Sequence, residues 1–182
     1  MRTGTKNAYK FITGKNNLPM VDLGWKSVGV LELTALPSVG RDIWLPQVME
    51  ADVFLVGGGD PLFLNYWMVN SGFAEILPTL GDKVYCGLSA GSMVLAPNIG
   101  EDFVNWRPLS GGDETLGIVG FSIFPHLDHP NLPENTLADA KKWAAGMTVP
   151  CYAIDDESGI KVIGDQIEVI TEGHWHFFPQ QG

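Results

Sequence analysis

A serine at the centre of a glycine-flanked turn is the residue of this sequence best suited to nucleophilic chemistry. Gly87, Ser89 and Gly91 fit the pattern G-x-S-x-G within the segment YCGLSAG. Residues 84–86 are typical of a strand, and an apolar helix start follows the serine. In such a strand–turn–helix the serine takes a strained backbone conformation, and the glycines avoid a clash with the neighbouring strand or helix. The pattern predicts a nucleophilic Ser89, with a plain tight turn as the alternative.

Four histidines could supply the base that a serine hydroxyl needs at neutral pH. His126 follows directly after a predicted strand, as Ser89 does, which favours it as the base over a merely capped strand-end histidine. His129 is expected to be a loop residue near the site. His174 and His176 lie two positions apart on a terminal strand without a third ligand, so neither a metal site nor a catalytic role is expected for them.

An acid is needed to fix the tautomer of the base and to stabilise its protonated form. Asp156 and Glu157 follow another predicted strand, and this strand-end placement favours them. Asp102, Asp113 and Asp128 remain as further candidates. The alternative interpretation of residues 155–157 is an acidic, solvated turn.

A run of three glycines, Gly57 to Gly59, follows the predicted strand at residues 53–56. The run lacks the lysine of a P-loop and the spacing of a dinucleotide-binding motif, which excludes nucleotide binding of those kinds. We expect the backbone amides of Gly58 and Gly59, together with that of Ala90, to form an oxyanion hole.

Strands alternate with helices from about residue 28 to residue 154, which predicts an α/β three-layer sandwich with a mostly parallel sheet. The expected strands are residues 28–33, 53–56, 84–86, 118–124 and 149–154, with a closing hairpin of 160–163 and 167–170. The expected helices are residues 44–50, 62–70, 73–80, 92–95 and 135–146. Such sheets bind ligands at the carboxyl ends of their strands, where the glycine run, Ser89 and His126 are expected.

The composition of the chain argues against several classes of partner. The 182 residues suggest one domain, 1–182, and the net charge of −10 without a Lys/Arg cluster argues against nucleic acid and anionic membranes as partners. No apolar run is long enough for a transmembrane helix, and the polar start has no apolar leader. Cys86 and Cys151 lie in apolar runs and are expected to be buried thiols, which favours a cytoplasmic location. No cofactor is expected.

Four segments together resemble peptidase family S51, the group of peptidase E (aspartyl dipeptidases) and cyanophycinases. They are ADVFLVGGGDPLFL (51–64), YCGLSAGSMVLAP (85–97), FSIFPHLDH (121–129) and YAIDDESGIKV (152–162). The resemblance implies a fold similar to class I glutamine amidotransferases, which is flavodoxin-like. It also implies a metal-free serine hydrolase that acts on peptide bonds.

By the same resemblance, Ser89 matches the nucleophile, His126 the base, and Gly58 and Gly59 the glycine-rich loop. The strand-end acid of the family falls on Asp156, with Glu157 one step away. Some members carry an acid shortly after the nucleophile helix, and Asp102 is the nearest match to it.

The sequence departs from the family pattern at three places. Asp60 stands where the glycine loop usually has asparagine, which would disfavour an acidic substrate. The arginine of aspartyl dipeptidases has no match beyond Lys141 and Lys142. The family's N-terminal strand and helix are expected to be missing, and the resulting open sheet edge predicts a homodimer.

The sequence thus predicts a serine peptidase, dipeptidase- or exopeptidase-like, that acts on a small peptide or related amide. One alternative is a catalytically inactive binding or structural protein with the same fold. The other is an α/β-hydrolase esterase, in which His174 or His176 would be the base.

Overall fold

The computed structural model describes residues 8, 23–109 and 111–180 of the chain. The helices are α2 (Arg41–Glu50), α3 (Pro61–Asn70), α4 (Phe73–Ile76), α5 (Ala90–Met93) and α6 (Leu137–Ala144), with 3₁₀ turns at Leu36–Ser38, Leu77–Thr79 and Glu101–Phe103. The strands are β1 (Val53–Val56), β2 (Val84–Gly87), β3 (Ser122–Phe124), β4 (Cys151–Ile154), β5 (Ser158–Ile163), β6 (Gln166–Thr171) and β7 (Trp175–Phe178).

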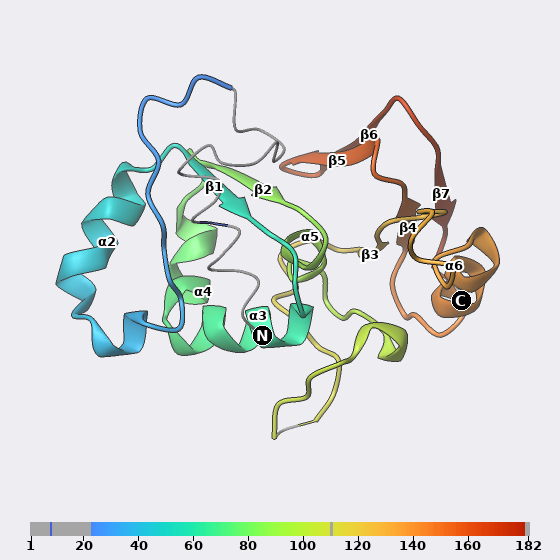
Figure 1. Cartoon of the computed structure of the whole chain (residues 1–182), viewed down its shortest axis with the longest axis horizontal. Coiled ribbons are helices and arrows are strands. Elements are labelled where there is room, and N and C mark those ends of the chain that lie inside the picture. Colours follow the sequence, from blue (N-terminus) through green and yellow to red (C-terminus); the bar gives the residue numbers. More distant parts are fainter. Residues whose placement is uncertain (1–7, 9–22, 110, 181–182) are drawn as a thin grey trace.

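The predicted α/β class with parallel strands is confirmed. β1 pairs with β2 in parallel, β3 pairs with β4 in parallel, and β7 lies antiparallel to β4. In the described part of the chain these strands form separate hydrogen-bonded groups, and β5–β6 is a third. Figure 1 shows α5 between the half that carries α2, α3 and α4 and the half that carries β4, β7 and α6. The flavodoxin-like arrangement in three layers remains a prediction.

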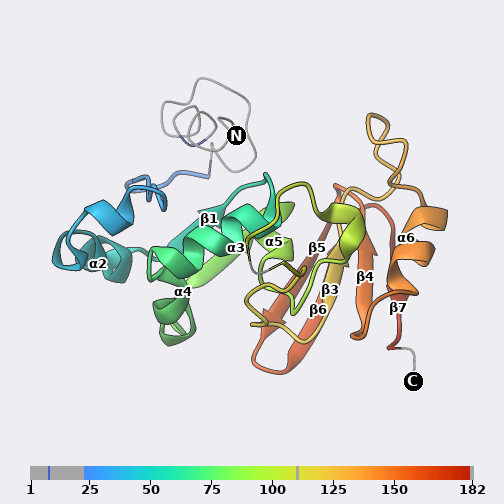
Figure 2. The same cartoon turned by 90° about the horizontal axis from the view of Figure 1, so that it is seen from below.

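Three apolar clusters hold these elements together. The largest joins α2, α3 and α4 to the β1–β2 pair and includes Trp44, Met68 and Phe73. A second packs α6 against β3 and β4 through Trp143, and Figure 2 shows α6 beside these strands. A small third cluster of Leu62, Met93 and Ile99 connects α3 with α5. The Trp143 indole donates a hydrogen bond to the Ile99 carbonyl at 2.8 Å, which links the second cluster to the third.

The strand predicted at residues 28–33 is wrong. These residues pair with no strand in the described part of the chain, and the carbonyls of Glu32 and Leu33 instead accept hydrogen bonds within a turn. Leu31 and Leu33 pack against the largest cluster, whereas Val28 and Val30 are exposed. The residues are apolar enough for a strand, but a strand also needs a partner edge to satisfy its backbone groups.

Several predicted elements are present with changed ends. β3 begins only at Ser122, because the amides of Ile118 and Val119 both donate to the Leu95 carbonyl, two residues beyond α5. The helix expected at residues 92–95 starts directly after the serine, at Ala90. The hairpin is confirmed, with Gly164 in its turn at a φ of 57°.

Some of the remaining sequence predictions concern residues that the structure describes. Cys86 is half-buried and Cys151 is buried, and no disulfide joins them. Burial raises the pKa of both thiols, that of Cys151 to about 11. Within the described ranges no helix has the length and apolarity needed to cross a bilayer. The predictions about the N-terminus, which concern an apolar leader and the family's first strand and helix, fall largely on residues outside those ranges. The single domain, the cytoplasmic location and the homodimer remain predictions.

Candidate active site

Ser89 occupies a sharp turn between β2 and α5, as the pattern predicted. Its backbone has a φ of 55° and a ψ of −120°, a conformation that is unfavourable for a residue with a side chain. Its carbonyl accepts hydrogen bonds from the Ser92 hydroxyl at 2.7 Å and from the Met93 amide at 3.0 Å. The Tyr85 hydroxyl donates to the Gly91 carbonyl at 2.7 Å, and desolvation raises the pKa of this phenol, which keeps it a donor. These contacts hold the strained turn in place.

The two flanking glycines allow three backbone segments to pass close to one another. A Cβ on Gly87 would collide with the Gly91 carbonyl and lie 2.7 Å from the Ser92 nitrogen. A Cβ on Gly91 would overlap the carbonyl oxygen of Val56, at the end of β1. Real Cβ atoms do not approach backbone this closely, so the predicted reason for these glycines is confirmed.

The glycine run lies directly beside the serine. A Cβ on Gly58 would stand 3.2 Å from the Ser89 Cβ and 3.5 Å from its Oγ. Gly59 has a φ of 146°, a value that favours glycine. The Leu88 amide donates to the Val56 carbonyl at 2.9 Å, which ties the serine turn to the start of the glycine run. A substrate carbonyl beside Ser89 would therefore meet the backbone of this run, and the oxyanion hole of Gly58, Gly59 and Ala90 remains a prediction.

Asp60 has a structural contact for each of its carboxylate oxygens. Oδ1 accepts from the Phe63 amide at 2.8 Å and caps α3, and Oδ2 accepts from the Trp106 amide at 2.8 Å. A carboxylate at a helix N-terminus also interacts favourably with the helix dipole. The geometry thus makes Asp60 an anchor between α3 and the loop at Trp106, and its effect on an acidic substrate remains a prediction.

His126 and Asp156 meet at the carboxyl ends of the parallel pair β3–β4. The His126 Nδ1 lies 2.5 Å from the Asp156 Oδ1. The Leu127 amide donates to the Ile154 carbonyl at 2.9 Å, so backbone pairing continues beside this contact. With Nδ1 engaged by a carboxylate, Nε2 is the nitrogen available to act as a base, as in a Ser–His–acid site.

The other candidate acids make different contacts. The Glu157 amide donates to Asp155 at 3.1 Å, and the Asp113 carboxylate accepts from the Gly100 amide at 2.7 Å. Asp102 lies in the 3₁₀ turn Glu101–Phe103 and is exposed. Asp156 is therefore the acid, among the described residues, that touches His126.

His129 approaches the other oxygen of the same acid. Its Nε2 lies 3.6 Å from the Asp156 Oδ2, and its Nδ1 accepts a hydrogen bond from the Asn131 amide at 3.1 Å. Because Nδ1 is an acceptor, the neutral ring carries its proton on Nε2, which faces Asp156. His129 thus lies near the site, as expected, and contacts Asp156 with its donor nitrogen.

Ser89 and His126 are not joined by a hydrogen bond in the described part of the chain. α5, which starts at Ala90, packs against β3, which ends just before Pro125 and His126. The structure therefore contains the serine turn with its glycine run, and separately the His126–Asp156 pair. Catalytic hydrogen bonds are often long in the absence of substrate and tighten in its complex.

His174, expected to be catalytic only in the esterase alternative, lies between two aspartates. It contacts Asp128 and Asp155, which are 46 and 19 positions away in the sequence. No short motif or spacing signals contacts of this kind, because the pairing of β7 with β4 creates them.

Protonation of Asp155 is expected to lower the free energy of unfolding in acid. Partial burial alone would raise the pKa of Asp155, but hydrogen bonds from the Ser158 hydroxyl and from the amides of His174 and Glu157 outweigh it and lower the pKa. A carboxyl whose folded pKa is depressed stabilises the fold above its unfolded pKa, and this contribution is lost as the pH falls through the folded pKa. Urea unfolding between pH 7 and pH 3 should show a smaller loss of stability in Asp155→Asn than in wild type. Asp165→Asn, at the exposed hairpin tip, is the control and should follow wild type.

Comparison with known proteins finds a matching family and several related chains. The sequence model of peptidase family S51 matches residues 5–170. An uncharacterized peptidase from Pasteurella multocida is 27% identical over 136 residues, which cover 70% of this chain and 63% of the relative. Peptidase E from Streptomyces coelicolor is 30% identical over 131 residues, covering 67% of this chain and 53% of the relative. The chain thus spans between half and two thirds of the length of these relatives.

A solved structure supports the fold. The crystal structure of a peptidase from an acI-B1 actinobacterium superposes with a TM-score of 0.61 at 21% identity, covering 87% of this chain and 67% of the other. At this level of identity the likeness concerns the arrangement of the elements alone.

Proposed function

Because this chain belongs to peptidase family S51, we propose that it is a serine peptidase that hydrolyses a small peptide or a related amide. The observation that carries the proposal is the strained backbone of Ser89, at a φ of 55°, within a turn whose glycines admit no Cβ. Strain of this kind is concentrated at functional sites, where it aims a side chain that an ordinary turn would not expose.

In the proposed mechanism, the Ser89 Oγ attacks the substrate carbonyl carbon while the His126 Nε2 takes the hydroxyl proton. Asp156 holds the ring in the required tautomer and stabilises the imidazolium that forms. The carbonyl C–N bond of the substrate then breaks, and the nitrogen leaves as an amine that is protonated by His126. Water next attacks the acyl-enzyme, His126 takes its proton, and the proton returns to the Ser89 Oγ as the acid product leaves. Backbone amides of Gly58, Gly59 and Ala90 stabilise the oxyanion, and such a donor is typically worth about 3 kcal/mol of barrier.

A second candidate function is a binding protein without catalytic activity. The missing hydrogen bond between Ser89 and His126 favours it, because an inactive relative has no need to bring the two residues together. Both functions fit the same fold, so the reactivity of Ser89 is the property that distinguishes them.

The test is labelling of the protein with a fluorophosphonate probe, followed by intact mass and peptide mapping. The peptidase proposal expects a single adduct on Ser89. Ser38→Ala is the control, because Ser38 is an exposed serine in the 3₁₀ turn Leu36–Ser38 and has no part in the serine turn. The control should still be labelled at Ser89. A wild-type protein that takes up no probe would favour the binding function.

A further inference from the structure

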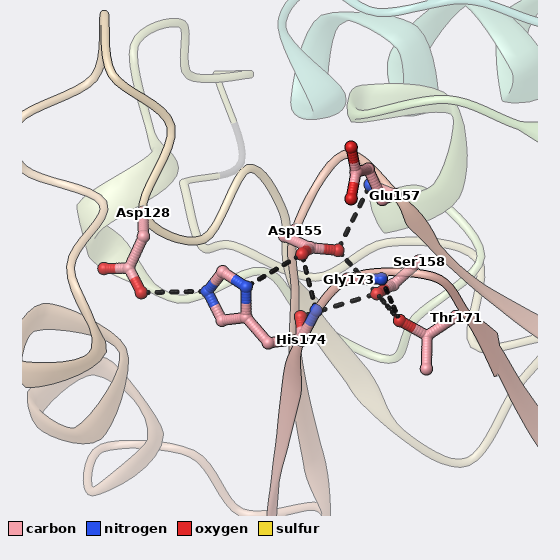
Figure 3. A network of polar contacts seen from close by, with 7 residues as sticks. All are labelled: Asp128, Asp155, Glu157, Ser158, Thr171, Gly173 and His174. Atoms are coloured by element: carbon pink, nitrogen blue, oxygen red, sulfur yellow. Dashed lines mark hydrogen bonds and ion pairs between the residues drawn. The ribbon is translucent and has the colours of Figure 1, made fainter.

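His174 forms a bridge between the two loops that carry His126 and Asp156. Its Nε2 lies 3.0 Å from the Asp128 Oδ2, and its Nδ1 lies 2.9 Å from the Asp155 Oδ2 (Figure 3). Its backbone amide also donates to the Asp155 Oδ2 at 2.6 Å. His174 is thus fixed at its backbone and at both ring nitrogens, and it belongs to neither of the loops that it joins.

The bridge links residues adjacent to the proposed base and acid. Asp128 lies two positions after His126 in the loop that follows β3, and Asp155 directly precedes Asp156 at the end of β4. The contacts His126–Asp156 and Asp128–His174–Asp155 therefore connect the same two loops at two places. Relative movement of the loops would disturb both connections.

The loop after β3 needs such restraints, because its backbone is strained. His126 and Asp128 both have positive φ values, 59° and 54°, which residues with side chains seldom adopt. The Asp128 amide donates to the Asn135 carbonyl at 2.7 Å, and the Asn135 side chain donates to the Pro125 carbonyl at 2.9 Å. The contact with His174 adds a restraint from outside this loop.

The hydrogen bond between His174 and Asp128 runs from the ring to the carboxylate. An ionised carboxylate only accepts hydrogen bonds, so the His174 Nε2 donates to Asp128, while the ring Nδ1 lies 2.9 Å from the Asp155 carboxylate. Asp155 is further held by the Ser158 hydroxyl at 2.5 Å and by the Glu157 amide at 3.1 Å. Its position is therefore defined without the ring, and the ring transmits that position to Asp128.

From this arrangement we propose that His174 is a positioning residue, which holds the loop of Asp128 against that of Asp155 so that His126 meets Asp156. The proposal rests on the proposed function of His126 and Asp156. Because 58% of the His174 side chain and 44% of that of Asp128 are exposed, the bridge adds little to global stability. Its loss is therefore expected to alter reactivity more than stability.

Kinetics of fluorophosphonate labelling at Ser89 test the proposal. His174→Ala should slow labelling about tenfold, since small misplacements of catalytic groups have effects of this size or larger. His176→Ala is the matched control, because His176 lies in β7 two positions after His174, and it should be labelled at the wild-type rate. Asp128→Ala should slow labelling as His174→Ala does, because both variants remove the contact between His174 and Asp128. For the same reason the double variant should be no slower than either single variant. Asp128→Asn should keep the rate, because its amide oxygen still accepts the bond.

A second readout does not depend on activity. The short His126–Asp156 contact should give a downfield proton NMR signal of the Nδ1–H, assigned by its absence from His126→Ala. The signal should broaden or move in His174→Ala and stay unchanged in His176→Ala. Wild-type labelling and an unchanged signal in His174→Ala would overturn the bridge. If the wild type is not labelled at all, the peptidase function fails and the NMR comparison alone decides the bridge. If His174→Ala does not fold, Asp128→Ala, which leaves β7 intact, gives the same comparison.

Discussion

Replacing Ser89 by alanine is expected to remove hydrolytic activity and probe labelling altogether. No other group in the proposed mechanism can form the covalent intermediate, and loss of a catalytic serine typically lowers kcat by about 10⁴-fold or more. The measurement is hydrolysis of a panel of dipeptides and dipeptide amides, with labelling of the same samples by intact mass. The fold should persist, because the substitution removes only a hydroxyl that makes no hydrogen bond within the described residues.

The variant His126→Ala separates the peptidase from the esterase alternative. If His126 is the base, His126→Ala should lose labelling as Ser89→Ala does. The esterase reading instead assigns the base to His174 or His176 and expects labelling to persist. Persistent labelling of Ser89→Ala, in contrast, would show that a different residue reacts with the probe and would remove Ser89 from the mechanism.

The serine turn was predictable because its determinants are local. Gly87, Ser89 and Gly91 lie within five residues, and the collisions that exclude a Cβ involve the turn itself and the adjacent strand. A short pattern can encode such a geometry, since the backbone conformation of each residue is restricted by its own side chain and its immediate neighbours. The same holds for the hairpin around Gly164.

The choice among acids depended on strand pairing. Strand-end placement left Asp156 and Glu157 open, and the register of β3 on β4 decides which carboxylate reaches His126. Glu157 is exposed, and its backbone amide donates to Asp155. Residues one position apart after a strand point in different directions, so a register that the sequence does not specify determines the contact.

Contacts across long sequence separations were not predictable from the sequence. Asp60 caps α3, which its position before Pro61 allows, but its second contact is with Trp106, 46 positions away. His174 reaches Asp128 across the same separation. Residues 28–33 have the apolar character of a strand, yet their location relative to a sheet edge depends on the whole fold.

The two parts of the candidate site belong to different groups of strands, which has a consequence for its assembly. Ser89 follows β2, whereas His126 follows β3, and among the described strands no ladder joins β2 to β3. Their relative position depends on packing through Met93 and Ile99 and on the Ser122 hydroxyl, which donates to the Asn98 carbonyl at 2.8 Å. The distance between nucleophile and base is therefore set by such packing, and by the backbone hydrogen bonds of Ile118 and Val119 to the Leu95 carbonyl, rather than by a sheet register.

Replacing Gly91 by alanine is expected to have the largest effect on stability. The new Cβ would overlap the Val56 carbonyl at the end of β1, and the colliding group is backbone rather than the end of a flexible side chain, so it cannot rotate away. We expect a loss of about 4 kcal/mol or more in the free energy of unfolding, at the upper end of the range for single substitutions. Urea unfolding measures this loss, and Ser89 labelling should disappear in the same variant because the turn cannot form.

Two further glycines give matched controls for this prediction. A Cβ on Gly120 meets no atom within 4 Å, and its φ is ordinary, so Gly120→Ala should unfold and label as wild type does. A Cβ on Gly58 would stand 3.2 Å from that of Ser89, so Gly58→Ala should slow labelling with a much smaller loss of stability. If Gly91→Ala is as stable as Gly120→Ala, then the close approach of α5 to β1 is not what maintains the strained serine. Reactivity and stability should therefore separate along this series, because Gly58 borders the nucleophile alone, whereas Gly91 borders the backbone that holds it.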